Sequence, residues 1–333
     1  GNMVDLKNIK VAVLVILCLQ NSIFTILRRY SQGVLKENYS KHEVLLLAEL
    51  IKILISGAVV SRGKNDPVKH LKGLAFKSGK MLALALIYGL MNILSFVALR
   101  NIGAGTFTVF AQLKILTTAI FSSIILNRKY TPVKWRALAT LILSCVLFSE
   151  HIWNNNMAYG VENGSALLGT IAVIAEVSLS GFASIYFEKV IKTDTDKLDI
   201  WERNFQLALT SFPVYILFIT FRERGTNIFQ GWSLVAFLLS LLGAAGGLLV
   251  ALSIKYADAI LKTFATSGAI VLSSLVDYLL LGGPLTAIMF VSGTLVVIAI
   301  CDYTFDPTPL ILHQDKEKGK VEAEQDIETT KAI

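Results

Sequence analysis

Long apolar segments, each close to 20 residues in length, recur along almost the entire chain and are separated by short polar connections. An α-helix needs about 20 apolar residues to cross the hydrocarbon core of a bilayer. A sliding hydropathy window of about 19 residues predicts ten such spans, near residues 9–29, 41–61, 80–99, 104–126, 132–150, 165–191, 200–222, 231–254, 258–281 and 285–305.

The composition supports a membrane protein. Of the 333 residues, 54% are hydrophobic and only 17% are charged, and the mean hydropathy is +0.62. Soluble domains average about 25% charged residues, so this chain has too little polar surface to cover a water-exposed fold. The spans also leave no room for a large soluble catalytic domain. We therefore expect an all-α integral membrane protein with ten transmembrane helices.

The basic residues predict the orientation. Of the 31 Lys and Arg residues, 22 flank the spans on the side of the two termini and seven lie on the opposite side. Basic residues concentrate on the cytosolic side of membrane proteins, so both termini should face the cytosol. Two glycosylation sequons, at Asn38 and Asn163, fall in connections assigned to the far side, although both lie close to a span.

The segments outside the spans are short. Residues 1–8 are expected to form a cytosolic N-terminus. Within it, Gly1 and Asn2 precede Met3 and resemble residues left behind after cleavage of an expression tag. No cleavable signal peptide follows, so the first span should serve as the targeting signal. Residues 306–333 are rich in Lys, Glu, Asp and Gln, and we expect a disordered cytosolic tail.

An even number of spans permits an internal repeat. Five spans per half, at 9–150 and 151–305, would give two inverted five-helix repeats, a transporter design in which the substrate site lies between the halves. A weak trace supports it: Pro132 opens the fifth span and Pro284 the tenth, an offset of 152 residues that also aligns Ser122 with Ser274.

The cysteine and histidine positions give little support for metal or thiol chemistry. The three cysteines lie inside apolar runs, and no histidine lies at bilayer depth. Small thiols in such positions pack as hydrophobic groups. We expect no disulfide framework, no metal site and no cofactor, and the basic charge marks orientation rather than nucleic-acid binding.

Lys114 is the most informative polar residue. It is the eleventh residue of a 23-residue span, and no acidic residue lies within seven positions on either side. Its stem is too short to reach an interface from the midplane. An ammonium group in such a position either loses its proton or binds an anion. Phe107, two helical turns earlier on the same face, would add an aromatic surface, a pairing that suits a phosphate joined to a flat base.

Other polar residues at membrane depth leave alternatives open. Glu49 and Lys52 share one helix face and can neutralise each other, or they can contact substrate. Glu176 has no partner nearby in the sequence, and it is either a proton site or a group facing water. Lys262, one turn into its helix, either binds an anion or extends to the interface.

Neutral groups at helical spacing complete the candidate site. Gln112 points away from Lys114 and is expected to join helices, and the small residues at 243–247 favour close helix packing. The candidate hydrogen-bonding residues are Tyr88, Asn92, Ser180, Gly181 and Asn204.

Four motifs resemble the nucleotide-sugar transporters. They are Ala-Glu-Leu-Ile-Lys at 48–52, Gln-Leu-Lys-Ile at 112–115, Ser-Gly-Phe-Ala-Ser-Ile-Tyr-Phe-Glu-Lys at 180–189 and Trp-Glu-Arg-Asn-Phe-Gln at 201–206. The likeness covers nearly all of residues 8–305, and it is greatest to the group that contains the CMP-sialic acid and UDP-galactose transporters.

The resemblance implies a drug/metabolite-transporter fold that exchanges a cytosolic nucleotide sugar for a nucleoside monophosphate from the Golgi lumen. It implies that Lys114 and Lys262 hold phosphate and that Tyr88, Asn92, Ser180 and Asn204 line the nucleoside pocket. Three positions depart from the family pattern, with Phe107 and Ala208 in place of tyrosines and Ala251 in place of a serine.

The function expected first is therefore exchange of a CMP-linked acidic sugar for CMP across the Golgi membrane. The alternative is a UDP-sugar exchanged for UMP. A proton-coupled exporter that uses Glu176 is a further alternative. An intramembrane enzyme is disfavoured, since the spans lack the midplane histidine or paired carboxylates that acid–base catalysis needs.

Overall fold

The computed structural model describes residues 2–150, 165–193, 196, 198–222 and 229–306, and every regular element within these ranges is a helix. The elements are α1 (Asn2–Arg29), the π-helix η1 (Tyr30–Val34), α2 (Lys41–Ser61), α3 (Pro67–Phe76), α4 (Gly79–Asn101), α5 (Ala104–Ala111), α6 (Lys114–Ile125), α7 (Pro132–Phe148), α9 (Ala166–Thr193), α10 (Ile200–Arg222), α11 (Leu234–Tyr256), α12 (Ala259–Leu281) and α13 (Ala287–Thr304).

The membrane-spanning helices agree with the hydropathy prediction. Nine helical segments in the described ranges are long and apolar enough to cross a bilayer. A tenth helix, α7, has 17 residues and packs along α13. The predicted all-helical, multi-span fold is confirmed. The sequon at Asn163 and the tail from residue 307 onward lie outside the described residues.

Local capping explains where several spanning helices begin and end. The side chain of Ser40 accepts hydrogen bonds from two backbone N–H groups at the start of α2. Asp258 caps α12 and Thr286 caps α13 in the same manner. Each cap satisfies a helix N–H group that has no partner within the helix. At its other end, α12 stops at Gly282, whose φ of +65° is a left-handed conformation that favours glycine.

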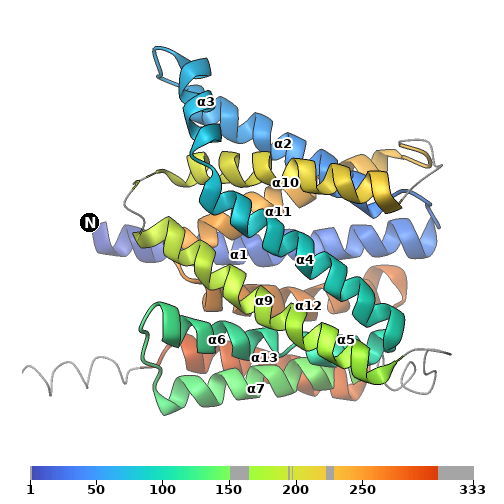
Figure 1. Ribbon diagram of the computed structural model, residues 1–333. Coiled ribbons are helices and arrows are strands. Elements are labelled where there is room, and N and C mark those ends of the chain that lie inside the picture. The colour runs from blue at the N-terminus through green and yellow to red at the C-terminus, as the bar shows by residue number, and fades with distance from the viewer. Residues whose placement is uncertain (1, 151–164, 194–195, 197, 223–228, 307–333) are drawn as a thin grey trace, which may run out of the picture.

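The packing of the helices is symmetric between the two halves of the chain. Helix α2 packs on α10 and α7 packs on α13, and these two pairs lie at opposite edges of the bundle (Figure 1). Between them, α1 crosses to pack on α11 and α12, while α9 crosses to pack on α4 and α6. Each contact has a counterpart five spans further along the chain.

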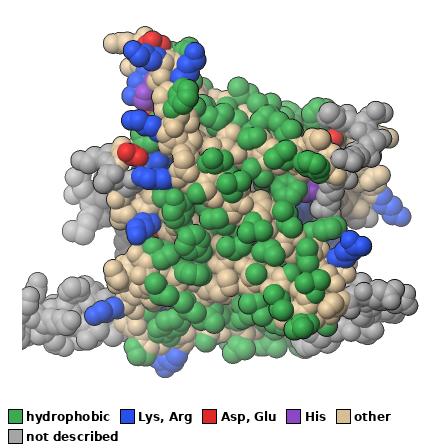
Figure 2. Space-filling model, viewed as in Figure 1, with side chains coloured by type: hydrophobic (Ala, Val, Ile, Leu, Met, Phe, Trp, Pro, Cys, Tyr) green, Lys and Arg blue, Asp and Glu red, His purple; other side chains and the backbone are tan. Residues whose placement is uncertain are grey.

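The surface fits a lipid environment. Hydrophobic side chains cover the broad middle of the visible face, whereas Lys and Arg gather mainly at the end where α1 begins and α3 lies (Figure 2). Large apolar residues are well exposed on the spanning helices; among them are Leu54, Ile124, Leu279 and Phe290. A soluble protein would not expose so much apolar surface.

Three local features differ from the sequence prediction. The first helix already begins at Asn2, within the segment expected to be a short polar terminus. An additional short helix, α3, follows Asp66, which caps it, and starts with Pro67. Pro284 precedes α13 by three residues instead of opening it, so its correspondence with Pro132, the first residue of α7, is approximate.

Candidate substrate site

The α-helix of the fourth span tightens at mid-depth, immediately before Lys114. Helix α5 ends at Ala111 and α6 begins at Lys114. In between, the amides of Gln112 and Leu113 bond to carbonyls three residues earlier, a tighter turn than that of an α-helix. Both residues keep right-handed helical torsions, so the span continues through this tighter turn as one segment from Thr106 to Ile125. Gln112 itself is buried, and its amide donates to the carbonyl of Thr108 (3.4 Å).

Two lysines from equivalent helices of the two halves approach each other. Lys114 starts α6 in the first half, and Lys262 lies in the first turn of α12 in the second half. The two ammonium groups interact electrostatically. Nζ of Lys262 donates to Oγ of Ser184 on α9, 3.1 Å away. Lys114 is exposed, yet its electrostatic partners lie on α7, α9 and α12, so the charge is directed into the bundle.

Helix α9 presents a polar stripe to these lysines. Glu176, Ser180, Ser184 and Glu188 follow one another at intervals of four residues and so share one face of the helix. Glu176 interacts with Lys114 and with the hydroxyl group of Ser95 on α4. Lys114 and Glu176 each lack a nearby charged partner in the sequence, but the fold brings the two together.

Glu188 closes the stripe at the end of the molecule where α1 begins. Its side chain is fully buried and pairs with Arg128 (2.5 Å) from the α6–α7 connection and with Lys192 (2.8 Å). It also accepts the backbone N–H of Ala259, the first residue of α12 (3.0 Å). Burial lowers the pKa of Arg128, but the Glu188 carboxylate more than offsets this and raises the pKa overall.

Gly181 packs helices together. A Cβ atom at this position would lie 2.5 Å from Oγ1 of Thr117 and 2.8 Å from the backbone of Thr117 and Thr118. The same contact contains a hydrogen bond from Thr117 Oγ1 to the carbonyl of Val177 (2.9 Å). Gly181 therefore permits the close approach of α9 to α6 that positions Lys114, whereas its neighbour Ser180 belongs to the polar stripe.

A second polar face lies on α4. Tyr88, Asn92 and Ser95 recur at helical spacing, and the amide of Asn92 donates to the carbonyl of Tyr88 (3.2 Å). Tyr88 interacts electrostatically with Glu49 on α2, while Ser95 meets Glu176. The polar face of α4 thus connects α2 with the lysine pair.

The Glu49–Lys52 pair forms at the α2 end of this polar face. The two side chains are joined at 2.7 Å, and both are largely buried. Oε2 of Glu49 has no hydrogen-bond partner among the described residues. Lys52 lies against Gly247 of α11, where a Cβ atom would come within 3.1 Å of Nζ. Tyr215 of α10, which is not among the predicted site residues, interacts electrostatically with Glu49 and Tyr88.

Two other predicted residues occupy different surroundings. Phe107, expected on the same face as Lys114, packs with the apolar cluster of α4 and α9 that includes Ala98 and Val173. Asn204 is only 4% exposed, and its Nδ2 has no hydrogen-bond partner in the described part of the chain. An unsatisfied amide at this depth favours a polar ligand or water.

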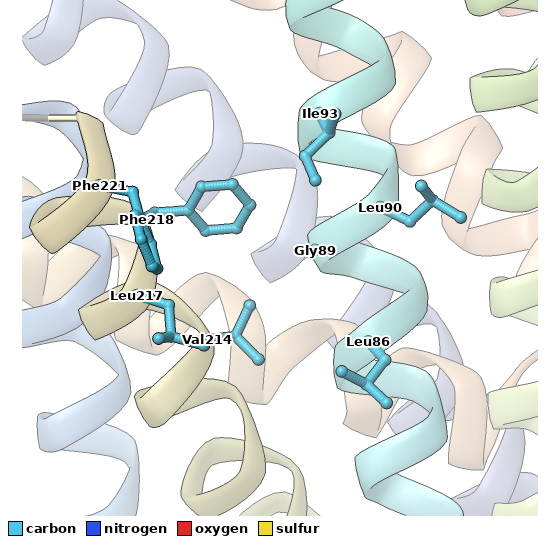
Figure 3. Close-up of a pocket in the computed structure, with 8 residues that line it drawn as sticks. All are labelled: Leu86, Gly89, Leu90, Ile93, Val214, Leu217, Phe218 and Phe221. Atoms are coloured by element: carbon cyan, nitrogen blue, oxygen red, sulfur yellow. The ribbon is translucent and has the colours of Figure 1, made fainter.

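A separate groove between α4 and α10 is apolar throughout. Its lining residues are drawn in Figure 3: Leu86, Gly89, Leu90 and Ile93 come from α4, and Val214, Leu217, Phe218 and Phe221 come from α10. Its volume is about 570 Å³. With no charged or hydrogen-bonding side chain in its lining, the groove offers nothing to a phosphorylated ligand. The polar side chains on α4, α6, α9 and α12 are therefore the better candidate site.

Known proteins resemble this chain over most of its length. The family model described as "Nucleotide-sugar transporter" matches residues 5–304. The human UDP-N-acetylglucosamine transporter is 34% identical, covering 91% of this chain and 97% of that protein. A UDP-galactose/UDP-N-acetylglucosamine transporter of Caenorhabditis elegans is 36% identical over 80% of this chain and 75% of its own length. The UDP-galactose transporter of Schizosaccharomyces pombe is 34% identical, with 89% and 87% covered.

The fold has a solved counterpart as well. A protein crystal structure aligns with a TM-score of 0.64 at 16% sequence identity, covering 89% of this chain and 96% of the other. That likeness concerns the fold alone. Together with the family match and the relatives that are more than 30% identical, it leads to one conclusion: this chain belongs to the nucleotide-sugar transporter family.

Proposed function

We propose that this protein exchanges a UDP-linked sugar for UMP across the Golgi membrane. The observation that carries the proposal is that Lys114 of the fourth span and Lys262 of the ninth lie within electrostatic reach of each other along the polar face of α9, where Lys262 binds Ser184. Adjacent ammonium groups repel each other unless an anion lies between them. The phosphates of a nucleotide provide that anion, and they are present both in the sugar nucleotide and in the monophosphate that returns.

The nucleotide is proposed to be uridine-linked, which corrects the first expectation from the sequence. The sequence alone favoured a CMP-linked acidic sugar. The relatives described above are named as transporters of UDP-N-acetylglucosamine and UDP-galactose. We therefore adopt the UDP-sugar alternative, with UMP as the counter-substrate.

The proposed mechanism is alternating access around a fixed central site. The Glu188 cluster joins the α6–α7 connection, α9 and the start of α12 at the end of the molecule where α1 begins. At the opposite end, Glu43 of α2 accepts a hydrogen bond from the indole N–H of Trp232, which precedes α11 (2.7 Å). Opening either side requires the contacts of that side to separate.

Strict exchange follows from charge. An empty pocket would carry the uncompensated repulsion of the two lysines through the low-dielectric interior, which slows the return of the unloaded protein. A bound nucleotide removes this penalty in both directions. Basic residues concentrated on the flanks that share the side of both termini support a cytosolic location for the termini.

Binding of radiolabelled UMP by the purified protein tests the lysine pair. Lys114→Met and Lys262→Met each remove one charge and retain an apolar stem. Since a charge-assisted hydrogen bond contributes about 1.5–3 kcal/mol, we expect each variant to bind UMP at least about tenfold more weakly. Lys64→Met, in the exposed connection before α3, is the matched control and should bind normally. Unchanged UMP affinity in both pocket variants would refute the proposed role.

A further inference from the structure

Glu176 is an acidic residue at the site that phosphate binding does not use. It lies on the polar stripe of α9, partly buried, beside the hydroxyl group of Ser95 and within electrostatic reach of Lys114. The other carboxylate of the stripe, Glu188, is held by Arg128 and Lys192 in direct ion pairs. Among the described residues, no such direct ion pair engages Glu176, whose carboxylate interacts with the Ser95 hydroxyl group and, through space, with Lys114.

The helix geometry puts Glu176 and Lys262 at opposite ends of the site. The hydrogen bond from Thr117 to the Val177 carbonyl sets α6 and α9 side by side, so Lys114, one turn earlier on α6, is close in level to Glu176. Ser184, which binds Lys262, lies eight residues further along α9, or about 12 Å at 1.5 Å per residue. Phosphates bound to Lys114 therefore lie near the level of Glu176, so the group attached to them on that side, the sugar in this proposal, comes within reach of its carboxylate.

The charge balance limits what this end accepts. Two lysines and one glutamate give the empty pocket a formal charge of +1, and the diphosphate of a nucleotide sugar brings about two negative charges. A carboxylate on the sugar would place a further negative charge close to Glu176. A neutral sugar has hydroxyl and acetamido groups that can donate hydrogen bonds to the same carboxylate.

We propose that Glu176 is a specificity-determining residue that selects nucleotide sugars with an uncharged sugar and rejects those with an acidic sugar. The proposal rests on the phosphate role of Lys114 and Lys262 described above. It assigns Glu176 a function distinct from proton coupling and from a purely structural counter-ion of Lys114. Those two roles affect neutral and acidic substrates to the same degree, whereas a specificity role changes the ratio between them.

The experiment compares two probes in proteoliposomes that contain the full-length protein and are preloaded with UMP. The probes are UDP-N-acetylglucosamine, which is neutral at the sugar, and UDP-glucuronic acid, which is acidic there. Initial uptake rates over a range of concentrations give kcat/KM for each probe. Glu176→Gln removes the charge and keeps the shape. Asp302→Asn, the matched control, makes the same carboxylate-to-amide change at an exposed position near the end of α13, outside the site.

We expect the wild-type protein to favour the neutral probe. Glu176→Gln should reduce that preference by about tenfold or more. This factor corresponds to the repulsion of two like charges roughly 10 Å apart at an effective dielectric constant of about 20. Asp302→Asn should keep the wild-type ratio. A ratio that Glu176→Gln leaves unchanged, or an equal loss for both probes, overturns the inference. Uptake of both probes that does not depend on UMP in the wild-type protein refutes the exchange function instead.

Discussion

Replacing Gly181 with alanine tests the contact that positions Lys114. The new Cβ atom would lie 2.5 Å from Thr117 Oγ1 and 2.8 Å from backbone atoms of Thr117 and Thr118. Side-chain rotation cannot relieve a clash with backbone, so α9 must move away from α6. Overpacking of this kind costs about 1–3 kcal/mol, and the higher helix propensity of alanine returns up to about 1 kcal/mol. We expect a net loss of about 1–2 kcal/mol.

The assay is thermal unfolding of the purified protein in detergent, followed by tryptophan fluorescence. At about 2–4 °C per kcal/mol for chains of this size, the unfolding midpoint should fall by about 2–8 °C. Gly57→Ala is the matched control, since its Cβ would meet only the ring of Phe205, at 3.5 Å and 3.6 Å. That control should stay within about 2 °C of the wild-type midpoint.

A double variant distinguishes the source of the strain. Thr117→Ala removes the hydroxyl oxygen at 2.5 Å but leaves the backbone contacts at 2.8 Å. Combined with Gly181→Ala, it should therefore recover only part of the loss. If Gly181→Ala proved as stable as the wild-type protein and yet lost UMP binding, the glycine would contact ligand directly, and the packing argument would be refuted.

Three further predictions concern the end of the molecule where α1 begins. Arg128→Met leaves the fully buried Glu188 with one cationic partner, so unfolding in detergent should show a loss of about 2–3 kcal/mol; wild-type stability would contradict the buried pair. Burial raises the pKa of Asp199, but hydrogen bonds from Lys255 and the backbone lower it overall. Because the folded pKa is depressed, this stabilisation is present above the unfolded pKa of about 3.9 and is lost as the pH falls through the folded value. The midpoint difference between the wild-type protein and Asp199→Asn should accordingly be constant above about pH 4 and shrink as the pH falls from there toward the lower folded pKa. A difference that stays constant over this range would exclude the ion pair as its source. Thr131→Ala removes the N-cap of α7 and should lower stability by about 1 kcal/mol, whereas Thr131→Ser should not.

Hydropathy and local signals predict the spanning helices well. The second span, predicted at 41–61, coincides with α2, and the seventh, predicted at 200–222, coincides with α10. Apolar run length, together with local caps such as Asp258, determines these boundaries. Such signals act over a few residues, so a single sequence contains them.

Features that depend on tertiary contact are harder to predict. The tighter turn before Lys114 contains neither proline nor glycine, and nothing in the local sequence marks it. The partnership of Lys114 with Glu176 spans 62 positions of the chain and exists only because α6 packs on α9. Helix α3 is different, since Asp66 followed by Pro67 is a recognisable start signal that the search for apolar spans passes over.

The candidate site was predicted in part. Lys114 and Lys262, which the resemblance implies hold phosphate, interact electrostatically with each other, while Phe107 and Gly181 occupy packing environments. Spacing alone cannot distinguish a small residue that permits helix contact from one that contacts a ligand, because both need the same absence of a side chain. Their direct roles in binding stay predictions.

Trans-stimulated uptake measures the central claim most directly. Proteoliposomes containing the wild-type protein are preloaded with UMP, with CMP or with buffer alone, and uptake of radiolabelled UDP-N-acetylglucosamine is followed. Exchange of a UDP-sugar for UMP predicts rapid uptake into UMP-loaded vesicles and much slower uptake into the other two. Equal uptake into empty vesicles would contradict obligatory exchange, and faster uptake into CMP-loaded vesicles would contradict the assignment of the nucleotide.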